Sequence, residues 1–271
     1  MSFRIDHLIT VTTTRETARA ELERMGFALT PRGEHPGRGT SNHLMFFGRC
    51  YWELLSVDEP GPSNSMLLGK GHMLAGCALR TANVARDAAA AVRLGVHADH
   101  TEPVTRPVRI GGEWQTARFV IVPITPQPPA DIHFFFCQHL TPELVWPREE
   151  MRHPNGAFRL AALHVVGPPP EGAGRGVFSL LGSGGGEEPE IEYLSSDAWH
   201  RRFAATPLSS GTPASERPKL ASLTLEVRDL DRCAAYLTAQ GVPHRRDRSE
   251  IQVRSEIIGH PIAFSASSPE S

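Results

Sequence analysis

The stretch that decides the fold reads IDHLITV and occupies Ile5–Val11. Its β-branched residues predict a strand. A helix should follow at once, because Thr13 and Glu16 stand three residues apart, as in a capping box with Thr13 as the N-cap. The helix should end at Gly26, a C′ residue that follows an apolar stripe at helical spacing formed by Ala18, Leu22 and Met25.

Three strands are predicted after this helix. Phe27–Thr30 is a short apolar segment, and a loop rich in proline and glycine leads from it to Asn42–Gly48. A tight turn at Gly48-Arg49 then connects to Cys50–Val57, so that the last two strands form a hairpin. The order of this first unit is therefore strand, helix and three strands, or βαβββ.

The same order returns in the next part of the chain. Gly76–Thr81 has the composition of a strand, Asn83 is placed to cap a helix, and Gly95 is placed to end it. Turns at Gly111-Gly112 and at Pro123–Pro129 should separate three further strands, which are Val104–Ile110, Thr116–Val122 and Ile132–Gln138.

Two more units begin later, and the first of them is weak. It opens with a strand at Leu160–Val166, continues with a glycine-rich helix over Pro170–Leu181 and a strand at Glu190–Leu194, and ends in an irregular region, Ser195–Pro218. The fourth unit has clearer signals, namely a strand at Leu220–Val227, an N-cap at Asp229, a C′ glycine at Gly241 and strands at Ile251–Val253 and Pro261–Phe264.

One βαβββ unit cannot bury the inner face of its small curved sheet, whereas two paired units enclose a shared core and a cavity. We therefore predict the α+β class, with repeated βαβββ modules that pair into curved mixed or antiparallel sheets. The first domain should span residues 1–145 and hold two modules, 3–58 and 74–140. A boundary rich in proline and glycine, Pro142–Asn155, separates it from a second, more degenerate pair of modules at 156–268.

The composition excludes several function classes. The chain has 271 residues, with 28 lysines and arginines against 30 acidic residues, so no basic surplus attracts nucleic acid. No apolar run reaches the roughly 20 residues that cross a bilayer, and the N-terminus lacks the apolar segment of a secretory signal. The four cysteines stand far apart without a CxxC pair, which favours buried free thiols in a reducing cytoplasm.

Several short motifs, taken in order, resemble one family. They are Asp6-His7-Leu8, His35 with Gly39-Thr40 and Asn42, Tyr51-Trp52-Glu53-Leu54, Phe136–Pro142 and His153-Pro154-Asn155-Gly156. The set is similar to the glyoxalase-like domain family of the vicinal oxygen chelate superfamily, which includes glyoxalases, extradiol dioxygenases and antibiotic-resistance proteins. The resemblance covers roughly residues 3–185. It implies paired βαβββ modules around a cavity and leaves the substrate open, because members of the superfamily run unrelated chemistries.

The resemblance also implies a divalent metal in the cavity, held by a histidine on the first strand of a unit and a glutamate on its last strand. His7 and Glu53 occupy those two positions. Imidazole nitrogen and carboxylate oxygen suit Zn²⁺, Fe²⁺, Mn²⁺ or Ni²⁺, and open coordination positions admit a pair of substrate oxygens. The alternative is that His7 is a hydrogen-bonded, half-buried histidine and that Glu53 is a surface charge on an edge strand.

The second unit departs from the glyoxalase pattern. Its first strand, Gly76–Thr81, offers no strong ligand other than Cys77, and its last strand carries no glutamate. His133, Gln138 and His139 are the substitutes, and His139 would complete a set of two histidines and one carboxylate with His7 and Glu53. Glu53 and His139 are then the catalytic candidates, although His139 fits equally as a cap of the following loop. The missing carboxylate argues against a glyoxalase I, whose reaction needs a base beside the metal.

A loop at the rim of the cavity supplies the substrate-binding candidates. His35, Arg38, Thr40 and Asn42 lie close together in sequence and, with Gln138, can hydrogen-bond a polar ligand. The alternative is a turn in which the glycines and Asn42 supply unusual backbone conformations.

These assignments lead to a metal-dependent enzyme that acts on a small oxygenated organic molecule. The metal would polarise vicinal oxygens in lyase, isomerase or dioxygenase chemistry. One alternative is a non-catalytic protein that sequesters a small molecule in an aromatic-lined cavity, as drug-resistance members do, and another is a structural dimer module. The sequence leaves open whether modules pair within one chain or across a homodimer. It also leaves open whether His164 and Glu192, which repeat the His7 and Glu53 arrangement, form a second centre.

Overall fold

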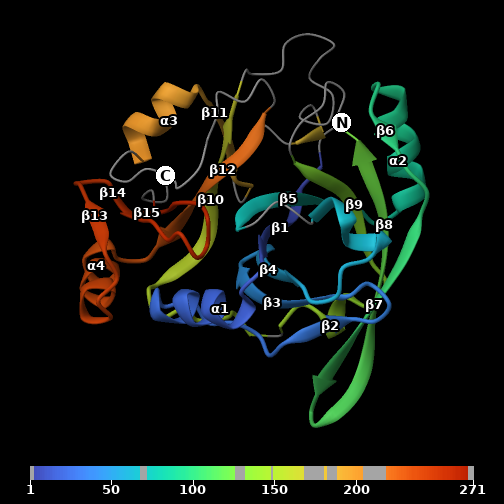
Figure 1. Ribbon diagram of the computed structural model, residues 1–271, viewed down its shortest axis with the longest axis horizontal. Helices are drawn as coiled ribbons and strands as arrows, with labels where there is room; N and C mark the ends of the chain where they lie inside the picture. Colours follow the sequence, from blue (N-terminus) through green and yellow to red (C-terminus); the bar gives the residue numbers. More distant parts are fainter. Residues whose placement is uncertain are drawn as a thin grey trace.

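The computed structural model describes residues 3–67, 72–125, 132–147, 149–167, 180–181, 188–203 and 218–267. Two curved β-sheets, one from each half of the chain, form the body of the molecule (Figure 1). In that view α2 lies at the right edge, and α3 and α4 lie at the left edge. Among the described residues, none of the helices is long and apolar enough to cross a membrane.

The first sheet is built by the first two units. The first unit consists of β1 (Ile5–Thr12), α1 (Arg15–Arg24), β2 (Gly33–His35), β3 (Thr40–Phe47) and β4 (Cys50–Val57), and the 3₁₀ helix η1 (Pro62–Leu67) follows it. The second unit consists of β5 (Met73–Arg80), α2 (Val84–Arg93), β6 (His97–Ala98), β7 (Glu102–Ile110), β8 (Glu113–Thr125) and β9 (His133–His139). Their strands form one sheet in the order β2-β3-β4-β1-β5-β9-β8-β6, and β7 pairs with β8.

The second sheet follows a short connection that contains the 3₁₀ helix η2 (Pro142–Leu144). Its elements are β10 (Ala157–Val166), β11 (Glu190–Leu194), α3 (Ser196–Phe203), β12 (Lys219–Val227), α4 (Leu230–Ala239), β13 (His244–Arg246), β14 (Glu250–Val253) and β15 (Ile262–Ala266). The strand order is β11-β10-β12-β15-β14-β13.

Both sheets obey the same pairing rule. In each unit the first strand runs parallel to the last described strand, as β1 does to β4, β5 to β9, β10 to β11 and β12 to β15. The first strands of neighbouring units pair antiparallel, β1 with β5 and β10 with β12. This arrangement confirms the predicted α+β class with paired βαβββ modules, and the pairing occurs within one chain.

The predicted helix caps are confirmed for α2 and α4. The side-chain oxygens of Asn83 and Asp229 accept the N–H groups of Arg86 and Arg232 at 2.9 and 3.0 Å. The helices are followed by glycines with positive φ, as a C′ position requires, at Gly26, Gly95 and Gly241.

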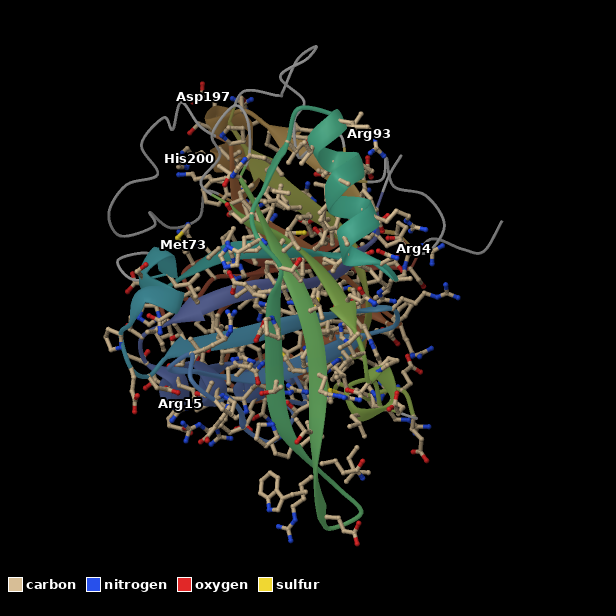
Figure 2. All side chains as sticks on the ribbon, turned by 90° about the vertical axis from the view of Figure 1, so that its right-hand side faces the viewer. Arg4, Arg15, Met73, Arg93, Asp197 and His200 are labelled. Carbon is tan, nitrogen blue, oxygen red and sulfur yellow. The ribbon has the colours of Figure 1, made fainter. Side chains whose placement is uncertain are left out.

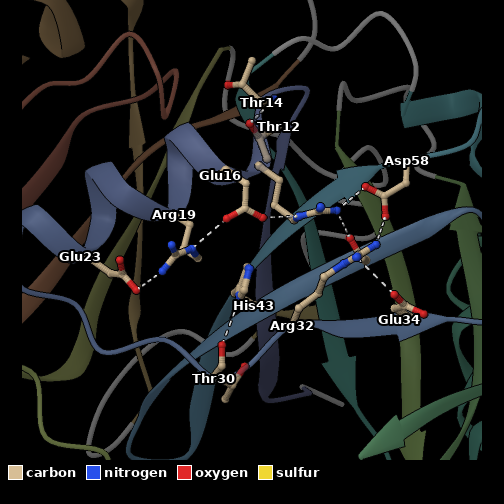
Figure 3. Close-up of polar contacts among 12 residues, drawn as sticks. Thr12, Thr14, Glu16, Arg19, Glu23, Thr30, Arg32, Glu34, His43 and Asp58 are labelled. Carbon is tan, nitrogen blue, oxygen red and sulfur yellow. Dashed lines mark hydrogen bonds and ion pairs between the residues drawn. The ribbon is translucent and has the colours of Figure 1, made fainter.

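The predicted capping box at the start of α1 is wrong. The N-cap is Thr14, and its side chain makes no capping hydrogen bond. The Glu16 carboxylate accepts hydrogen bonds from Arg15 and Arg19, each at 3.1 Å, in place of a backbone N–H (Figure 3). Charge-assisted bonds to arginine are stronger than a bond to a neutral amide, so Glu16 pairs with the arginines and does not cap the helix.

The short strand after α1 lies later than predicted. Phe27–Thr30 is not a strand, and Gly33–His35 takes that place as β2. The N–H of Ala28 donates to Nδ1 of His153, and the N–H of Thr30 donates to the carbonyl of Leu44, both at 3.0 Å. Because these amides bond to different parts of the molecule, the segment cannot form a regular ladder.

Two other expectations also need correction. The predicted irregular region after Glu190–Leu194 contains α3, because Trp199 and Phe203 are four residues apart and both bury against the second sheet. The turn predicted at Pro123–Pro129 does not begin at Pro123, since β8 continues to Thr125 and the Pro123 carbonyl accepts the N–H of Asp99 at 3.0 Å. The helix predicted over residues 170–181 lies outside the described residues, apart from its last two positions.

One hydrophobic core joins the two sheets. Phe27 from the first half stacks on Phe264 from the second, with ring centroids 6.0 Å apart. The Thr10 hydroxyl accepts the indole N–H of Trp52 at 2.8 Å and donates to Nε2 of His260 at 2.9 Å. A separate apolar cluster lines the other face of the first sheet and includes Ile9, Tyr51, Phe119 and Phe135.

Acidic pH should weaken this core. Burial lowers the pKa of His260 to about 4, well below the value of an exposed histidine, about 6.5. The unfolded chain therefore binds a proton that the folded chain rejects, and stability falls as the pH drops from about 6.5 towards 4. In urea titrations, H260Q should reduce this slope by up to about 1.4 kcal/mol per pH unit. An unchanged slope would contradict the assignment, and the exposed His97 gives the control, H97Q.

Candidate functional site

A cavity of about 120 Å³ lies in the first sheet, on the face of the separate apolar cluster. Inward-facing side chains of alternate strand residues form its walls. The long β7–β8 hairpin runs along this side of the molecule, and its tip projects beyond the rest of the chain (Figure 2). The lining includes the aromatic residues Tyr51, Phe119 and Phe135 and the polar residues His7, His35, Arg38, Thr40, Asn42, Glu53 and Arg106.

His7 and Glu53 share this cavity. Glu53 lies opposite Ile9 in the parallel β1–β4 pair, and His7 precedes Ile9 by two residues on the same face. Nε2 of His7 is 3.6 Å from Oε2 of Glu53, and the imidazole stacks on the Tyr51 ring at 4.4 Å between centroids. The alternative that placed Glu53 on an edge strand is wrong, because β4 lies between β3 and β1 and the side chain is buried.

Asp6 fixes the orientation of the His7 ring. Its side chain is fully buried, and Oδ1 accepts hydrogen bonds from Nδ1 of His7 at 2.9 Å and Nε2 of His139 at 3.0 Å. Nε of Arg80 donates to Oδ2 at 2.8 Å. Burial alone would raise the pKa of Asp6, but the bonds from His139 and His7 outweigh it and hold the pKa far below its ordinary value. With Nδ1 bonded to this carboxylate, Nε2 of His7 faces the cavity.

Asn42 fixes Glu53 from the other side. Its Nδ2 donates to Oε1 of Glu53 at 2.6 Å, which leaves Oε2 to face His7. Its Oδ1 accepts a hydrogen bond from Nη1 of Arg106 at 3.3 Å. Asn42 therefore links a buried carboxylate to a buried guanidinium.

The other rim residues predicted from the sequence also line the cavity. Nε2 of His35 lies 3.3 Å from Nδ2 of Asn42, and Nδ1 lies 2.8 Å from the Thr40 hydroxyl. Burial lowers the pKa of His35, which favours the neutral ring. The Arg38 guanidinium pairs with the carboxylate of Glu102.

Gln138 and His139 lie elsewhere. Oε1 of Gln138 accepts the N–H of Val84 at 3.0 Å and so completes the first turn of α2. His139 donates to Asp6 and contacts the edge of Phe119. Among the described residues that line the cavity, neither is present. The cavity thus brings together His7, Glu53, His35, Arg38, Thr40, Asn42 and His133, whereas Gln138 and His139 do not line it.

Asp6, Cys137 and His139 form a second group of potential ligand atoms, all within 4.8 Å of one another. The oxygens of Asp6 already accept three hydrogen bonds. Burial raises the pKa of the Cys137 thiol well above its ordinary value, and metals bind the thiolate form. The group therefore suits a hydrogen-bonded network better than a cation.

The second sheet repeats the histidine–glutamate arrangement with a different outcome. Nε2 of His164 is 3.4 Å from Oε2 of Glu192, while Arg202 from α3 bonds both Glu192 and Glu250 at 2.6 and 2.7 Å. Burial, and then the charge of Arg202, lower the pKa of His164 to about 3. Trp199 from α3 packs against this face and donates to Ser222. Protein side chains thus occupy the place that corresponds to the first cavity.

Arg106 is the site residue that the sequence analysis missed. It follows Val104 and precedes Val108 at two-residue spacing, and both valines pack against the cavity cluster. Period-two alternation therefore places Arg106 on the inward face of β7. The alternation was available in the sequence, but an arginine in a strand ordinarily faces solvent.

Loss of the Asp6 charge should destabilise the fold. D6N leaves the guanidinium of Arg80 and two buried imidazoles without their anionic acceptor, so we expect a loss of about 3 kcal/mol. Urea unfolding monitored by fluorescence measures this loss. D99N is the control, because Asp99 pairs with His97 at the exposed surface and should cost under about 1 kcal/mol. Equal losses in the two variants would contradict the prediction that the Asp6 carboxylate stabilises the fold.

Comparison with known proteins agrees with this architecture. The family model of the glyoxalase-like domain matches residues 5–177. Comparison with curated proteins finds no match. Among solved structures, a hypothetical protein from Staphylococcus aureus is 13% identical with a TM-score of 0.63, over 97% of this chain and 99% of that chain. A variant of 4-hydroxymandelate synthase from Streptomyces coelicolor is 14% identical with a TM-score of 0.61, over 98% and 92%.

A third structure is a fusion of a xylose isomerase-like TIM barrel with 4-hydroxyphenylpyruvate dioxygenase. It is 12% identical with a TM-score of 0.55, and all of this chain matches 49% of that protein. At such identities the likeness shows the fold alone. The family model covers well over half of the chain and matches the modules that build the cavity. The chain therefore belongs to the glyoxalase-like domain family.

Proposed function

We propose that the protein is a metal-dependent enzyme that acts on a small oxygenated organic molecule. His7 and Glu53 would hold a divalent ion, Zn²⁺, Fe²⁺, Mn²⁺ or Ni²⁺, in the cavity. The observation that carries the proposal is the pair of Nε2 of His7 and Oε2 of Glu53, 3.6 Å apart and each fixed from behind. Asp6 fixes the imidazole and Asn42 fixes the carboxylate.

The donor set fits a metal ion. A histidine that gives its Nδ1–H to a carboxylate presents the lone pair of Nε2, which is the usual arrangement of a metal-bound histidine. Two ligands about 2.1 Å from a shared tetrahedral ion lie about 3.4 Å apart, close to the observed separation. Two facing lone pairs at this distance repel each other unless a positive charge lies between them.

The remaining residues of the site have roles that their contacts suggest. When bound, the metal supplies a Lewis acid for two substrate oxygens. Tyr51, Phe119 and Phe135 form an apolar wall that limits access of water to the bound molecule. We assign His139 to positioning, because it acts on His7 through Asp6. Lyase, isomerase and dioxygenase reactions all agree with this site, and two structural neighbours are named as a synthase and a dioxygenase fusion.

One observation favours a second candidate function, a protein that binds and sequesters a small molecule. The β9 side chains that line the cavity are His133, Phe135 and Cys137, and none of these is a carboxylate. The last strand of the second unit therefore does not supply the second carboxylate that the glyoxalase pattern expects. The four cysteines are buried free thiols. Free thiols are typical of proteins in a reducing compartment, so we also propose a cytoplasmic location.

Metal content tests the proposal. The purified protein should bind about one equivalent of Zn²⁺ or Mn²⁺, measured by mass spectrometry of the metal and by calorimetry after treatment with EDTA. H7A and E53Q each remove one ligand and should weaken binding by about 100-fold or more.

H97A is the matched control, because His97 is exposed and lies on β6, outside the cavity. Circular dichroism must show that all variants remain folded. Full metal content in both H7A and E53Q would overturn the proposed ligands. Metal-free protein that still binds small aromatic molecules would favour the sequestering function.

A further inference from the structure

The guanidinium of Arg106 is a buried cation that lines the cavity. The residue lies in the middle of β7 and is 7% exposed. Nη1 donates to Oδ1 of Asn42 at 3.3 Å, and Nε is buried without a hydrogen-bond partner. In the described part of the chain, no carboxylate forms an ion pair with it.

Such an arrangement is costly for an isolated charge. A buried charge is stable in a protein when it is paired and hydrogen-bonded, and five N–H donors of an arginine favour a planar anion. Burial lowers the pKa of Arg106, while the nearby charge of Glu53 opposes this shift. Asn42 stands between the two groups, because one end of its amide bonds Glu53 and the other bonds Arg106.

Two other basic side chains that line the cavity, Arg38 and His35, differ from Arg106. Arg38 pairs with the carboxylate of Glu102, so its charge is already compensated. Burial lowers the pKa of His35, which favours its neutral form. Of the two described arginines that line the cavity, Arg106 is therefore the one without a carboxylate in an ion pair, and a negatively charged ligand can supply it.

The backbone leaves space for this arginine. Gly33 on β2 lies opposite Asn42 in the sheet register. A Cβ atom at Gly33 would lie 2.5 Å from Oδ1 of Asn42 and 2.8 Å from Cδ of Arg106. Any side chain at this position must push both groups away, so glycine permits the contact between them.

We propose that Arg106 binds the carboxylate of the substrate and that the cavity takes small organic acids. This proposal adds a substrate class to the function proposed above. It rests on that function only for the part of the substrate that would reach His7 and Glu53. One guanidinium near the negative charge of Glu53 favours a monoanion over a phosphate dianion. The aromatic wall of Tyr51, Phe119 and Phe135 favours an acid with an apolar or aromatic body.

A pair of probes that differ only in charge tests this inference. Mandelate and its neutral amide, mandelamide, are titrated by calorimetry into EDTA-treated protein and into Zn²⁺-loaded protein. The wild type should bind the acid about 10- to 100-fold more tightly than the amide, in line with a charged hydrogen bond. In R106Q the acid and the amide should bind with about equal affinity. R106K should keep part of the preference for the acid, because the charge remains.

R109Q is the matched control, since Arg109 is an exposed arginine three residues along the same strand, and it should keep the full preference for the acid. G33A provides a second variant that keeps Arg106 itself but displaces its side chain, and it should also weaken binding of the acid. Equal affinity of the wild type for acid and amide, or an unchanged preference in R106Q and G33A, would overturn the inference.

The two proposals can fail separately. A preference for the acid that depends on Arg106 in EDTA-treated protein, together with absence of metal binding, would support the anion site and refute the metal centre. Metal binding that depends on His7 and Glu53, without any preference for the acid, would do the reverse.

Discussion

The hydrogen bond from His7 to the buried carboxylate of Asp6 is the constraint on which the site depends. Asp6 also accepts bonds from His139 on β9 and Arg80 on β5. One carboxylate thereby joins the first strand of one module to the first and last strands of the other. Since both of its oxygens are bonded, the ring of His7 cannot rotate without breaking a buried charged interaction. The same contact that holds the modules together thus orients the imidazole towards the cavity.

Asn42 plays the corresponding part on the opposite wall. Its side-chain oxygen accepts a hydrogen bond from the guanidinium of Arg106, and its side-chain nitrogen donates one to the carboxylate of Glu53. These contacts place an anion, an imidazole and a cation around one small space, each with a fixed direction. Preorganised polar groups in a largely apolar cavity interact with a ligand more strongly than the same groups in water. The arrangement is therefore suited to a molecule that has both oxygen ligands and a negative charge.

The second half of the chain shows what happens when the same topology carries different side chains. His164 and Glu192 again lie near each other, but Arg202 compensates Glu192, and Trp199 and Phe203 pack on that face. The second sheet has become a structural partner that buries the back of the first sheet through contacts such as Phe27 with Phe264. The first sheet thus carries a cavity on the face where the corresponding face of the second sheet is covered by α3.

The sequence by itself determined the α+β class, the order of the modules, and the caps at Asn83 and Asp229, because these depend on local periodicity and on residues a few positions apart. It also singled out His7 and Glu53 through the family pattern. Tertiary structure decided the rest. Phe27–Thr30 does not form the predicted strand, because its amides bond to residues more than ten positions away. Gln138 accepts a hydrogen bond from α2 and does not line the cavity. The environment of Arg106 depends on Gly33 and Asn42 from other strands. A buried, unpaired charge is a property of a three-dimensional neighbourhood, which local sequence does not encode.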